Sequence, residues 1–179
     1  MAVVLAAMTL VQAAKSGDDL AFDVLLEPLL EPAYRLACAM LHDHYAAEDA
    51  VQEAALKAWR KLGHLRDGSE MRPWFLGIVA NECRTTRRSR WSSVLKALGP
   101  DKPVDEPADT VLSGIELRRA LLAMDSKKRL TLVLHWYLDL PLDEVATITG
   151  SSLHAAESRL QRGIHELRQR MEGHRGYRS

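Results

Sequence analysis

Four polar side chains that could do chemistry lie within six positions near residue 50. They are Glu48, Asp49, Gln52 and Glu53, in the stretch AAEDAVQEAALKAW of residues 46–59. Carboxylates at this spacing can hold a metal ion, exchange protons as a general acid and base, or form a charged docking surface. Carboxylate metal sites on helices also use a Glu-x-x-His motif, and none follows here, because His42 and His44 precede the stretch.

The small apolar residues between these four predict where they lie. Apolar residues at intervals of three and four are typical of the buried stripe of an amphipathic helix. Here they are Ala47, Ala50, Val51, Ala54 and Ala58. The acidic residues then form i,i+4 pairs on the outer side, without the burial that would separate their pKa values for catalysis. We therefore expect no catalytic residue, metal or cofactor, and two interpretations stay open: a solvated face and a docking surface.

A second candidate site lies near the C-terminus, where the sequence has the pattern of a helix-turn-helix. A short helix is predicted over 141–148, Gly150 suits a left-handed position after it, and Ser151 or Ser152 can cap the last helix. The inward stripe of that helix would be Leu153, Ala156, Leu160, Ile164, Leu167 and Met171. Its early exposed residues would enter the major groove of DNA; they are His154, Ala155, Glu157, Ser158, Gln161 and Arg162. A helical hairpin with a solvated face is the alternative.

A third candidate is the basic segment RTTRRSR of residues 84–90, which continues a helix that begins near Trp74 and Phe75. Aromatic rings beside arginines suit single-stranded nucleic acid, because bases stack on the rings while guanidinium groups hold phosphates. The alternative is that both aromatic residues belong to the core and that the arginines only solvate the helix end.

Charge alternates in sign along the chain although the formal net charge is zero. Residues 1–60 hold 4 basic and 9 acidic groups, a net −5, and residues 61–96 hold 8 and 3, a net +5. Residues 97–125 hold 3 and 6, a net −3, and residues 126–179 hold 9 and 6, a net +3. Because salt screens charge over about 8–10 Å, a polyanion would respond to separate segments rather than to the total.

Helical periodicity dominates the 179 residues, so we predict an all-α fold of two small helical domains. A linker over 97–111, rich in proline and acidic residues, separates units at 1–96 and 112–173, and a tail covers 174–179. Pro28 and Pro32 are expected to bend or restart the helix over 20–41.

The N-terminus and the cysteines indicate a protein of the cytosol rather than a secreted or membrane protein. Val4, Met8 and Val11 share one side of a predicted first core helix, which lacks the basic start of a signal peptide. No run of 18 apolar residues occurs, so no membrane crossing is expected. Cys38 and Cys83 lie in apolar runs, which fits buried thiols in a reducing cytosol better than a disulfide framework.

The order of these motifs resembles that of bacterial RNA polymerase sigma factors, in particular the minimal two-domain extracytoplasmic-function (ECF) type of the sigma-70 superfamily. The resemblance covers nearly the whole chain. It rests on Gly17-Asp18 with Ala21-Phe22, Ala47 to Glu53 with Trp59, Pro73-Trp74-Phe75, Asn81, Arg87-Arg88, Leu142 to Ala146, and Ser158-Arg159-Leu160 with Arg162.

The resemblance implies a role for each candidate site. Residues 1–96 would be sigma region 2, in which Glu48, Asp49, Gln52 and Glu53 dock on the clamp helices of the polymerase's largest subunit. The same region would recognise and melt the −10 element and hold its non-template strand through His64, Arg66, Arg72, Trp74, Asn81, Arg84, Arg87 and Arg88. Residues 112–173 would be region 4, reading the −35 duplex through His154, Glu157, Ser158, Arg159, Gln161 and Arg162. The partners implied are core polymerase (clamp helices and flap), promoter DNA and, as in many relatives, an anti-sigma protein, with the chain in the cytoplasm.

Three positions differ from the usual pattern of that family. Thr85 stands near an expected aspartate, His154 to Glu157 replace a glycine-threonine-valine-lysine run, and Met124 to Ser126 replace a leucine-proline turn. Glu157 is thus an acidic residue where the family usually has a lysine, and this difference affects which −35 sequence the chain is expected to read. Two other functions remain to be tested: a conventional helix-turn-helix regulator with an N-terminal sensing or dimerisation domain, and a metalloenzyme using the acidic and histidine residues of 42–53.

Overall fold

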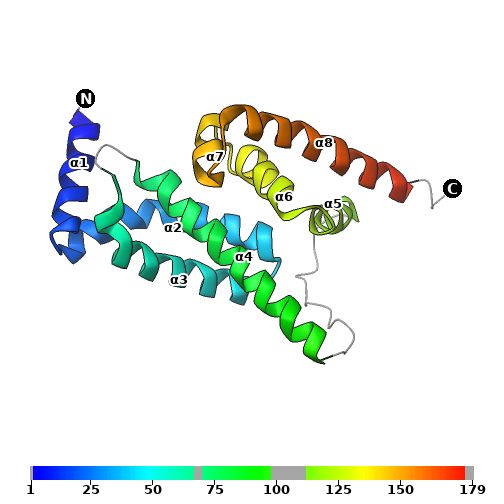
Figure 1. Cartoon of the computed structure of the whole chain (residues 1–179), viewed down its shortest axis with the longest axis horizontal. Coiled ribbons are helices and arrows are strands. Elements are labelled where there is room, and N and C mark those ends of the chain that lie inside the picture. The colour runs from blue at the N-terminus through cyan, green and yellow to red at the C-terminus, as the bar shows by residue number, and fades with distance from the viewer. Residues whose placement is uncertain (1, 67–69, 98–111, 176–179) are drawn as a thin grey trace. The chain divides into compact units, whose positions relative to one another are not determined.

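The computed structural model describes residues 2–66, 70–97 and 112–175, which form helices and turns without a β-strand in these ranges (Figure 1). The chain divides into two compact units, residues 1–88 and 89–179. The predicted all-α class is confirmed. The predicted linker, apart from Ala97 at the end of a helix, and residues 176–179 of the tail lie outside the described residues.

The first unit contains α1 (Ala2–Lys15), α2 (Asp19–Leu41), α3 (His44–Lys61), the 3-10 turn η1 (Leu62–His64) and most of α4 (Met71–Ala97). Aspartates begin two of these helices. The Asp18 side chain accepts from the Ala21 N–H at 3.0 Å, and the Asp43 side chain accepts from the Ala46 N–H at 2.9 Å. Each carboxylate satisfies an amide that the first turn would otherwise leave unpaired.

Both prolines of α2 lie inside one continuous helix, so the predicted restart does not occur. A proline removes the hydrogen bond to the carbonyl four residues earlier. Those carbonyls belong to Val24 and Pro28, which are exposed, so water can serve them. The helix ends instead at His42, whose φ of 53° is left-handed and whose amide donates to the Cys38 carbonyl at 2.9 Å.

The core of the first unit is built from small residues on α2 and α3. The whole predicted stripe of α3 is buried, and Ala47, Ala54 and Ala58 are fully so. Ala33, Leu36 and Ala37 of α2 are also fully buried. Short side chains let the two helix backbones approach closely, which explains the extensive contact between α2 and α3. Val4 and Met8 of α1 lie outside the described side chains.

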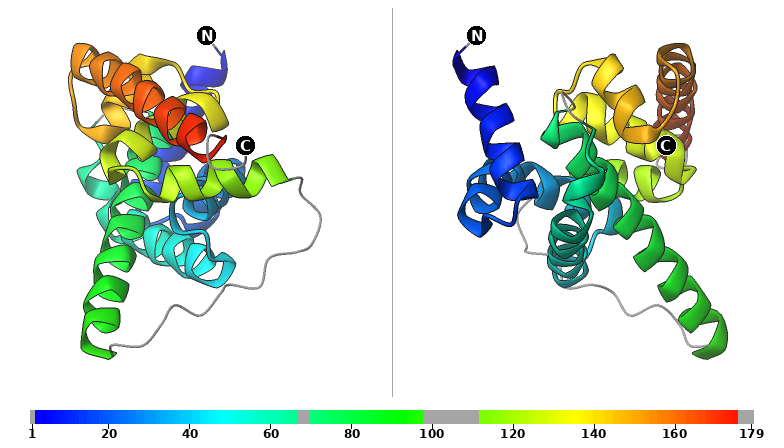
Figure 2. Two further views of the ribbon diagram at one scale, coloured as in Figure 1. Left: turned by 90° about the vertical axis from the view of Figure 1, so that its right-hand side faces the viewer. Right: turned by 60° about the vertical axis from the view of Figure 1, so that its left-hand side comes forward.

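The second unit contains α5 (Leu112–Leu122), α6 (Ser126–Leu132), a π-helical turn η2 (Val133–Tyr137), α7 (Leu142–Thr149) and α8 (Leu153–Arg175). Helix α8 packs on α5, α6 and α7 (Figures 1 and 2). Gly163 on α8 permits close approach to α6, because a Cβ there would lie 3.3 Å from the Leu132 side chain. The core holds Met124, Leu132 and Leu160, with Leu121, Leu142, Ile164 and Leu167 packed against it.

The caps predicted for α7 and α8 are present. Gly150 has φ 62° and ψ 39° and ends α7 in the left-handed conformation. The Ser152 hydroxyl accepts from the Ala155 N–H at 3.2 Å, which begins α8. One member of the predicted inward stripe is wrong: Leu153 is 47% exposed, because it is the first residue of α8 and lies at the edge of its packed face.

The turn at 124–126 has its own capping residue. The Asp125 side chain accepts from the amides of Lys127 and Lys128 at 3.0 and 3.2 Å and begins α6. Arg129, fully buried, donates to the carbonyls of Leu122 and Met124 at 2.8 and 3.1 Å. These bonds tie the end of α5 to α6, so the missing leucine-proline turn does not prevent the fold.

The two cysteines are free thiols. Cys83 is fully buried, as predicted, and burial raises the pKa of its thiol to about 12. Cys38 is only half-buried, so the prediction of a buried thiol is wrong there. Its pKa is raised as well, mainly by burial.

Candidate docking and nucleic-acid surfaces

The polar face of α3 is exposed in all four predicted positions: Glu48, Asp49, Gln52 and Glu53. Asp49 and Glu53 lie one turn apart, as do Glu48 and Gln52, because residues four apart share a helix face. The Asp43 cap and the buried alanine stripe hold this face outward. It presents three carboxylates and one amide.

Two exposed apolar residues extend this face, and the sequence pattern did not single them out. Tyr45 is 82% exposed and Leu56 is 50% exposed. Residues 45, 49, 52 and 56 follow the 4-3-4 spacing of one helix face. That spacing was a signal in the sequence, but an exposed tyrosine or leucine cannot be recognised without the fold. The α3 face is hereafter these six residues, 45, 48, 49, 52, 53 and 56.

Helix α4 carries the predicted basic surface, and only part of it lies on one side. At 100° per residue, Asn81, Arg84 and Arg88 fall within about 60° of one another, whereas Arg87 lies about 120° from Asn81. Asn81, Arg84 and Arg88 are exposed and Arg87 is half-buried. The Arg84 guanidinium donates to the Asn81 side-chain oxygen. The strand face is hereafter Trp74, Asn81, Arg84 and Arg88.

The two aromatic residues of α4 differ in burial. Phe75 is fully buried with Leu76 and Val79, so it belongs to the core, as the alternative interpretation held. Trp74 is half-buried and keeps part of its ring available. Thr85 lies between Asn81 and Arg88 on the same side, and its hydroxyl donates to the Asn81 backbone carbonyl at 3.1 Å. At about 40° from Asn81 and 100° from Arg84, this neutral residue borders the strand face.

The loop before α4 contains the other predicted strand-binding residues. His64 in η1, Arg66 and Arg72 in the first turn of α4 are all exposed. Leu65 is buried, and the Lys15 ammonium group donates to its carbonyl at 2.6 Å, which fastens this end of the loop to α1. Residues 67–69 lie outside the described part.

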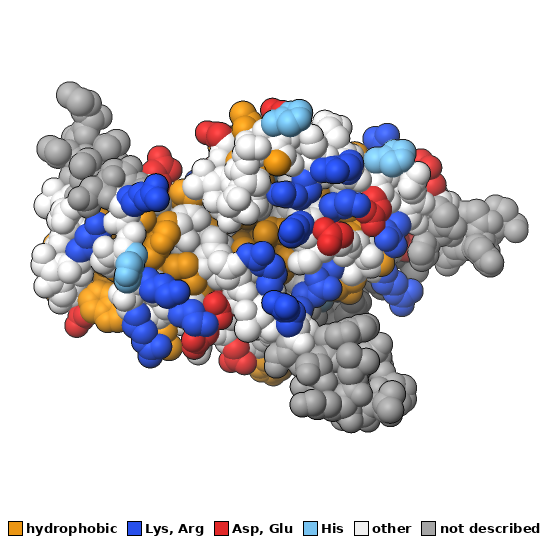
Figure 3. All heavy atoms as spheres, viewed as in Figure 1, with side chains coloured by type: hydrophobic (Ala, Val, Ile, Leu, Met, Phe, Trp, Pro, Cys, Tyr) orange, Lys and Arg blue, Asp and Glu red, His pale blue; other side chains and the backbone are white. Residues whose placement is uncertain are grey.

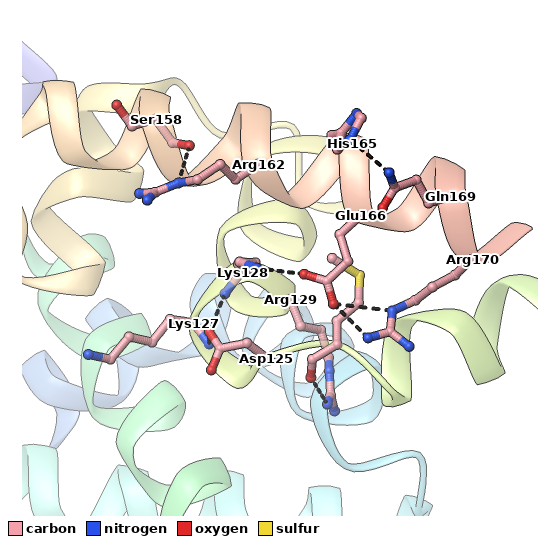
Figure 4. Close-up of polar contacts among 11 residues, drawn as sticks. Asp125, Lys127, Lys128, Arg129, Ser158, Arg162, His165, Glu166, Gln169 and Arg170 are labelled. Atoms are coloured by element: carbon pink, nitrogen blue, oxygen red, sulfur yellow. Dashed lines mark hydrogen bonds and ion pairs between the residues drawn. The ribbon is translucent and has the colours of Figure 1, made fainter.

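The start of α8 presents the predicted base-reading residues. His154, Glu157, Gln161 and Arg162 are exposed, and Ala155, Ser158 and Arg159 are half-buried. His154 Nδ1 lies 4.0 Å from Glu157 Oε2. Arg162 Nε donates to the Ser158 carbonyl at 3.0 Å, so its guanidinium lies along the helix (Figure 4).

A polar network continues this surface between α6 and α8. Glu166 accepts from Lys128 at 2.6 Å and from Arg170 at 2.7 Å, and these two cations, Lys128 first, hold the pKa of its carboxyl below its ordinary value (Figure 4). Figure 3 shows Lys and Arg side chains gathered over α6 and α8 of the second unit. Lys128 was missed from the sequence because it lies 38 residues from Glu166, a separation that no local pattern spans.

Among the described side chains, no group of three or more His, Cys, Asp or Glu residues that could hold a metal occurs. His44 instead lies 3.0 Å from the Tyr34 hydroxyl through its Nδ1. Within the described ranges, no helix combines the length and the apolar character that a bilayer crossing requires.

Comparison with known proteins relates this arrangement to one family. A family model described as "Sigma-70 region 2" matches residues 25–93, which contain both the α3 face and the strand face. The chain is 29% identical over 159 residues to a probable RNA polymerase sigma factor RfaY of Xanthomonas campestris, aligning 83% of this chain and 40% of that protein. It is 27% identical over 147 residues to the ECF RNA polymerase sigma factor SigM of Mycobacterium tuberculosis, aligning 82% and 75%.

A solved structure resembles the fold as well. It is that of the sigma factor RpoE of Bartonella quintana in complex with the anti-sigma factor NepR, with a TM-score of 0.69 and 23% identity over 84% of this chain and 96% of that one. The alignment to RfaY spans less than half the length of that relative. The matched region 2, the ECF relatives and the shared all-helical fold agree: this chain belongs to the ECF type of the sigma-70 family.

Proposed function

We propose that this chain binds core RNA polymerase and directs it to promoters by reading duplex DNA at −35 and holding the melted strand at −10. The observation that carries the proposal is the pairing of two exposed helical surfaces within the matched region 2, an acidic α3 face and a basic strand face. Proteins that it resembles are RNA polymerase sigma factors by name. The chain acts in this proposal by binding, and it makes or breaks no covalent bond.

The α3 face docks on the clamp helices of the polymerase. Its carboxylates pair with basic side chains of the partner, which sets the register of the complex. Tyr45 and Leu56, both exposed, add apolar contact at the two ends of the face. Tyrosine is among the residue types enriched at the positions that dominate interface energies.

The strand face and the loop residues His64, Arg66 and Arg72 hold the non-template strand at −10, with Arg87 a lesser contributor because it is half-buried. Extruding a base from the stack costs a few kcal/mol. Stacking on an aromatic ring returns about 1–3 kcal/mol per base, and the partly exposed Trp74 ring can supply it. Protein contacts can therefore keep the strand open without ATP.

The start of α8 enters the major groove at −35. Gln161 and Arg162 are exposed there and can donate to base edges, while Ser158 and Arg159 lie closer to the helix surface. Glu157 can accept from a cytosine amine. Lys128, near the same helix, adds positive charge beside the groove-facing residues.

Two further parts of this proposal concern partners and place. The structure with the similar fold holds a sigma factor together with an anti-sigma factor, and we propose an anti-sigma protein as a regulatory partner of this chain. The cytoplasm, where polymerase works, is the proposed location. The linker of 97–111 is proposed to occupy the RNA path of the polymerase, and the polymerase flap is proposed as a second contact.

Run-off transcription tests the proposal directly. Core polymerase with and without the purified chain is supplied with a pool of genomic promoter fragments, and transcript starts are mapped. We expect new starts that share −10 and −35 sequences and depend on the chain. If no start site depends on it, the proposed function is wrong, and a palindromic footprint of the chain alone would favour a conventional regulator.

A further inference from the structure

Lys57 of α3 lies between two carboxylates that belong to different surfaces. Its Nζ is 2.6 Å from Glu82 Oε2 on α4 and 3.3 Å from Glu53 Oε1 on α3. Glu53 is part of the α3 face, and its side chain is 47% exposed. Glu82 directly follows Asn81 of the strand face, and its side chain is only 12% exposed. The Lys57 ammonium group thus links α3, which carries the α3 face, to α4, which carries the strand face.

Because Glu82 is buried, its carboxylate depends on the ion pair with Lys57. A charged carboxylate withdrawn from water is costly unless a cation and hydrogen bonds compensate it. Lys57 supplies such a cation, and its hydrogen bond to Glu82 is the main cause that raises the pKa of the Lys57 ammonium group. A raised pKa means that the Lys57 side chain is charged at neutral pH, as an ion pair with Glu82 requires.

The geometry of α4 converts removal of this ion pair into movement of the strand face. Successive residues are 100° apart, so Glu82 lies about 100° from Asn81 and about 60° from Thr85. A Glu82 carboxylate without its cation would gain free energy by reaching water. Any turn of α4 about its axis that achieves this also turns Asn81, Arg84 and Arg88.

We propose that Lys57 and Glu82 are positioning residues, which hold the strand face of α4 in a fixed orientation relative to the α3 face. The proposal rests on the proposed function of the two surfaces. It also predicts that docking affects the strand face. When a basic side chain of the docked partner pairs with Glu53, Glu53 no longer competes with Glu82 for the Lys57 ammonium group. Lys57 is then left to Glu82, so docking strengthens the ion pair that orients the strand face.

The experiment separates docking from strand capture in reconstituted holoenzyme. Variants are Lys57→Met, which keeps most of the length of the side chain without its charge, Glu82→Gln, and the exchanged pair Lys57→Glu with Glu82→Lys. Affinity for core polymerase is measured by anisotropy of the labelled chain. Open complexes are measured at saturating core polymerase by permanganate reactivity of unpaired thymines, on a promoter where the wild-type chain is active.

We expect Lys57→Met to keep wild-type or tighter core affinity, and Glu82→Gln to keep wild-type or slightly weaker affinity, because it leaves Lys57 to Glu53. Both variants should form about 5-fold fewer open complexes, the low end of energetic coupling between sites. The exchanged pair should recover most of that decrease. Lys61→Met is the matched control, because Lys61 ends the same helix, is exposed, and loses the same charge. It should behave as wild type in both measurements.

Three outcomes would overturn the inference. Equal decreases in core affinity and open complexes would make the ion pair merely structural. If both single variants form as many open complexes as the wild type, the ion pair has no role in strand capture. If the exchanged pair folds but does not recover open-complex formation, loss of the ion pair is not the cause of the decrease. Each of these leaves the proposed function intact, because an inactive wild-type chain would already have shown in the transcription assay.

Discussion

The arginines of α4 show how position decides the role of one residue type. Arg88 is exposed on the same side as Asn81, whereas Arg87, its neighbour in sequence, is half-buried and lies about 100° away. Identical charge therefore does not mean identical contact with a strand. The pattern Arg87-Arg88 by itself cannot separate the two residues.

Arg88→Ala is expected to weaken open-complex formation more than Arg87→Ala. Removing the protein's grip on one phosphate of a single strand should reduce the slope of log affinity against log salt by about 0.7. We expect that reduction for Arg88→Ala and a smaller one for Arg87→Ala, measured by titrating holoenzyme with bubble-containing promoter DNA at several salt concentrations. If both variants show the same slope as the wild type, neither arginine contacts a phosphate of the strand.

Glu157 places a negative charge where DNA is proposed to bind. Its side chain is 50% exposed, and the imidazole of His154 lies 4.0 Å away from it. A carboxylate at this position repels phosphate unless it accepts from a base amine. Its effect on affinity therefore depends on the base that faces it.

Glu157→Lys should tighten binding of holoenzyme to duplex −35 DNA and relax its sequence preference, because repulsion is replaced by attraction to phosphate. The salt slope should steepen by about 0.9 for one new phosphate contact. Glu172→Lys, the same change on an exposed residue far along α8, is the control. Weaker binding of Glu157→Lys to every sequence would contradict this account.

At the scale of elements, α3 shows how a helix can serve two purposes on its two sides. Its alanine stripe is buried and its acidic side is exposed, so a change on the outer side should leave the fold unaffected. The four polar residues are consequently a place where the proposed docking can be tested without unfolding the first unit.

Asp49→Lys with Glu53→Lys should abolish co-purification with core polymerase while the far-ultraviolet circular dichroism stays that of the wild type. Charge-complementary contacts become repulsive when both signs match, and such juxtaposition costs several kcal/mol. Asp23→Lys with Glu27→Lys on exposed positions of α2 makes the same change in net charge. If that control loses binding equally, net charge rather than the α3 face determines docking.

The Lys128–Glu166–Arg170 network links α6 to α8 and gives the second unit an acid-sensitive contact (Figure 4). The pKa of Glu166 is lowered in the folded chain, so the network contributes stability above the ordinary carboxyl pKa of 4.5 and loses it as pH falls below that value. Solvent screening limits the contribution to about 0.5–1 kcal/mol.

Glu166→Gln should therefore lower the free energy of unfolding at pH 7 by about 0.5–1 kcal/mol and reduce the further decrease on acidification. Urea unfolding at pH 7 and below pH 4 measures both effects. Glu172→Gln, on an exposed position of the same helix, should follow the wild-type pH dependence. An unchanged pH dependence in Glu166→Gln would show that the network contributes nothing to stability.

At the scale of the whole molecule, the alternation of charge matters more than its sum. The net charge is zero, yet acidic and basic segments follow one another along the chain. Because each basic segment is preceded by an acidic one, the chain has little non-specific attraction for DNA at a distance. In the proposed function, affinity for a promoter should therefore depend on polymerase, which would place both proposed DNA-binding surfaces on one promoter and add its own contacts.

The free chain should bind duplex promoter DNA weakly, and holoenzyme should bind it tightly, as joint engagement of two linked surfaces raises apparent affinity by about 10²–10⁴-fold. Electrophoretic mobility shifts with the chain alone, core alone and both together measure this. Tight binding by the free chain, with a two-fold symmetric footprint, would contradict the account.

Much of the fold followed from local patterns in the sequence. The alanine stripe of α3, the left-handed Gly150 and the serine cap of α8 were all predictable because their causes lie within one or two helical turns. The same locality identified the acidic, basic and C-terminal candidate segments. It misjudged Cys38 and Leu153, because burial at these positions depends on neighbours distant in sequence.

Only the tertiary structure decided how the candidate residues are grouped. It buried Phe75, set Arg87 apart from Arg88, exposed Tyr45 and Leu56 beside the acidic residues, and brought Lys57 to Glu82 across 25 positions. The physical reason is that hydrophobic periodicity determines which side of a helix is buried, whereas an ion pair between helices depends on how their packed sides meet. A single sequence specifies that packing without displaying it.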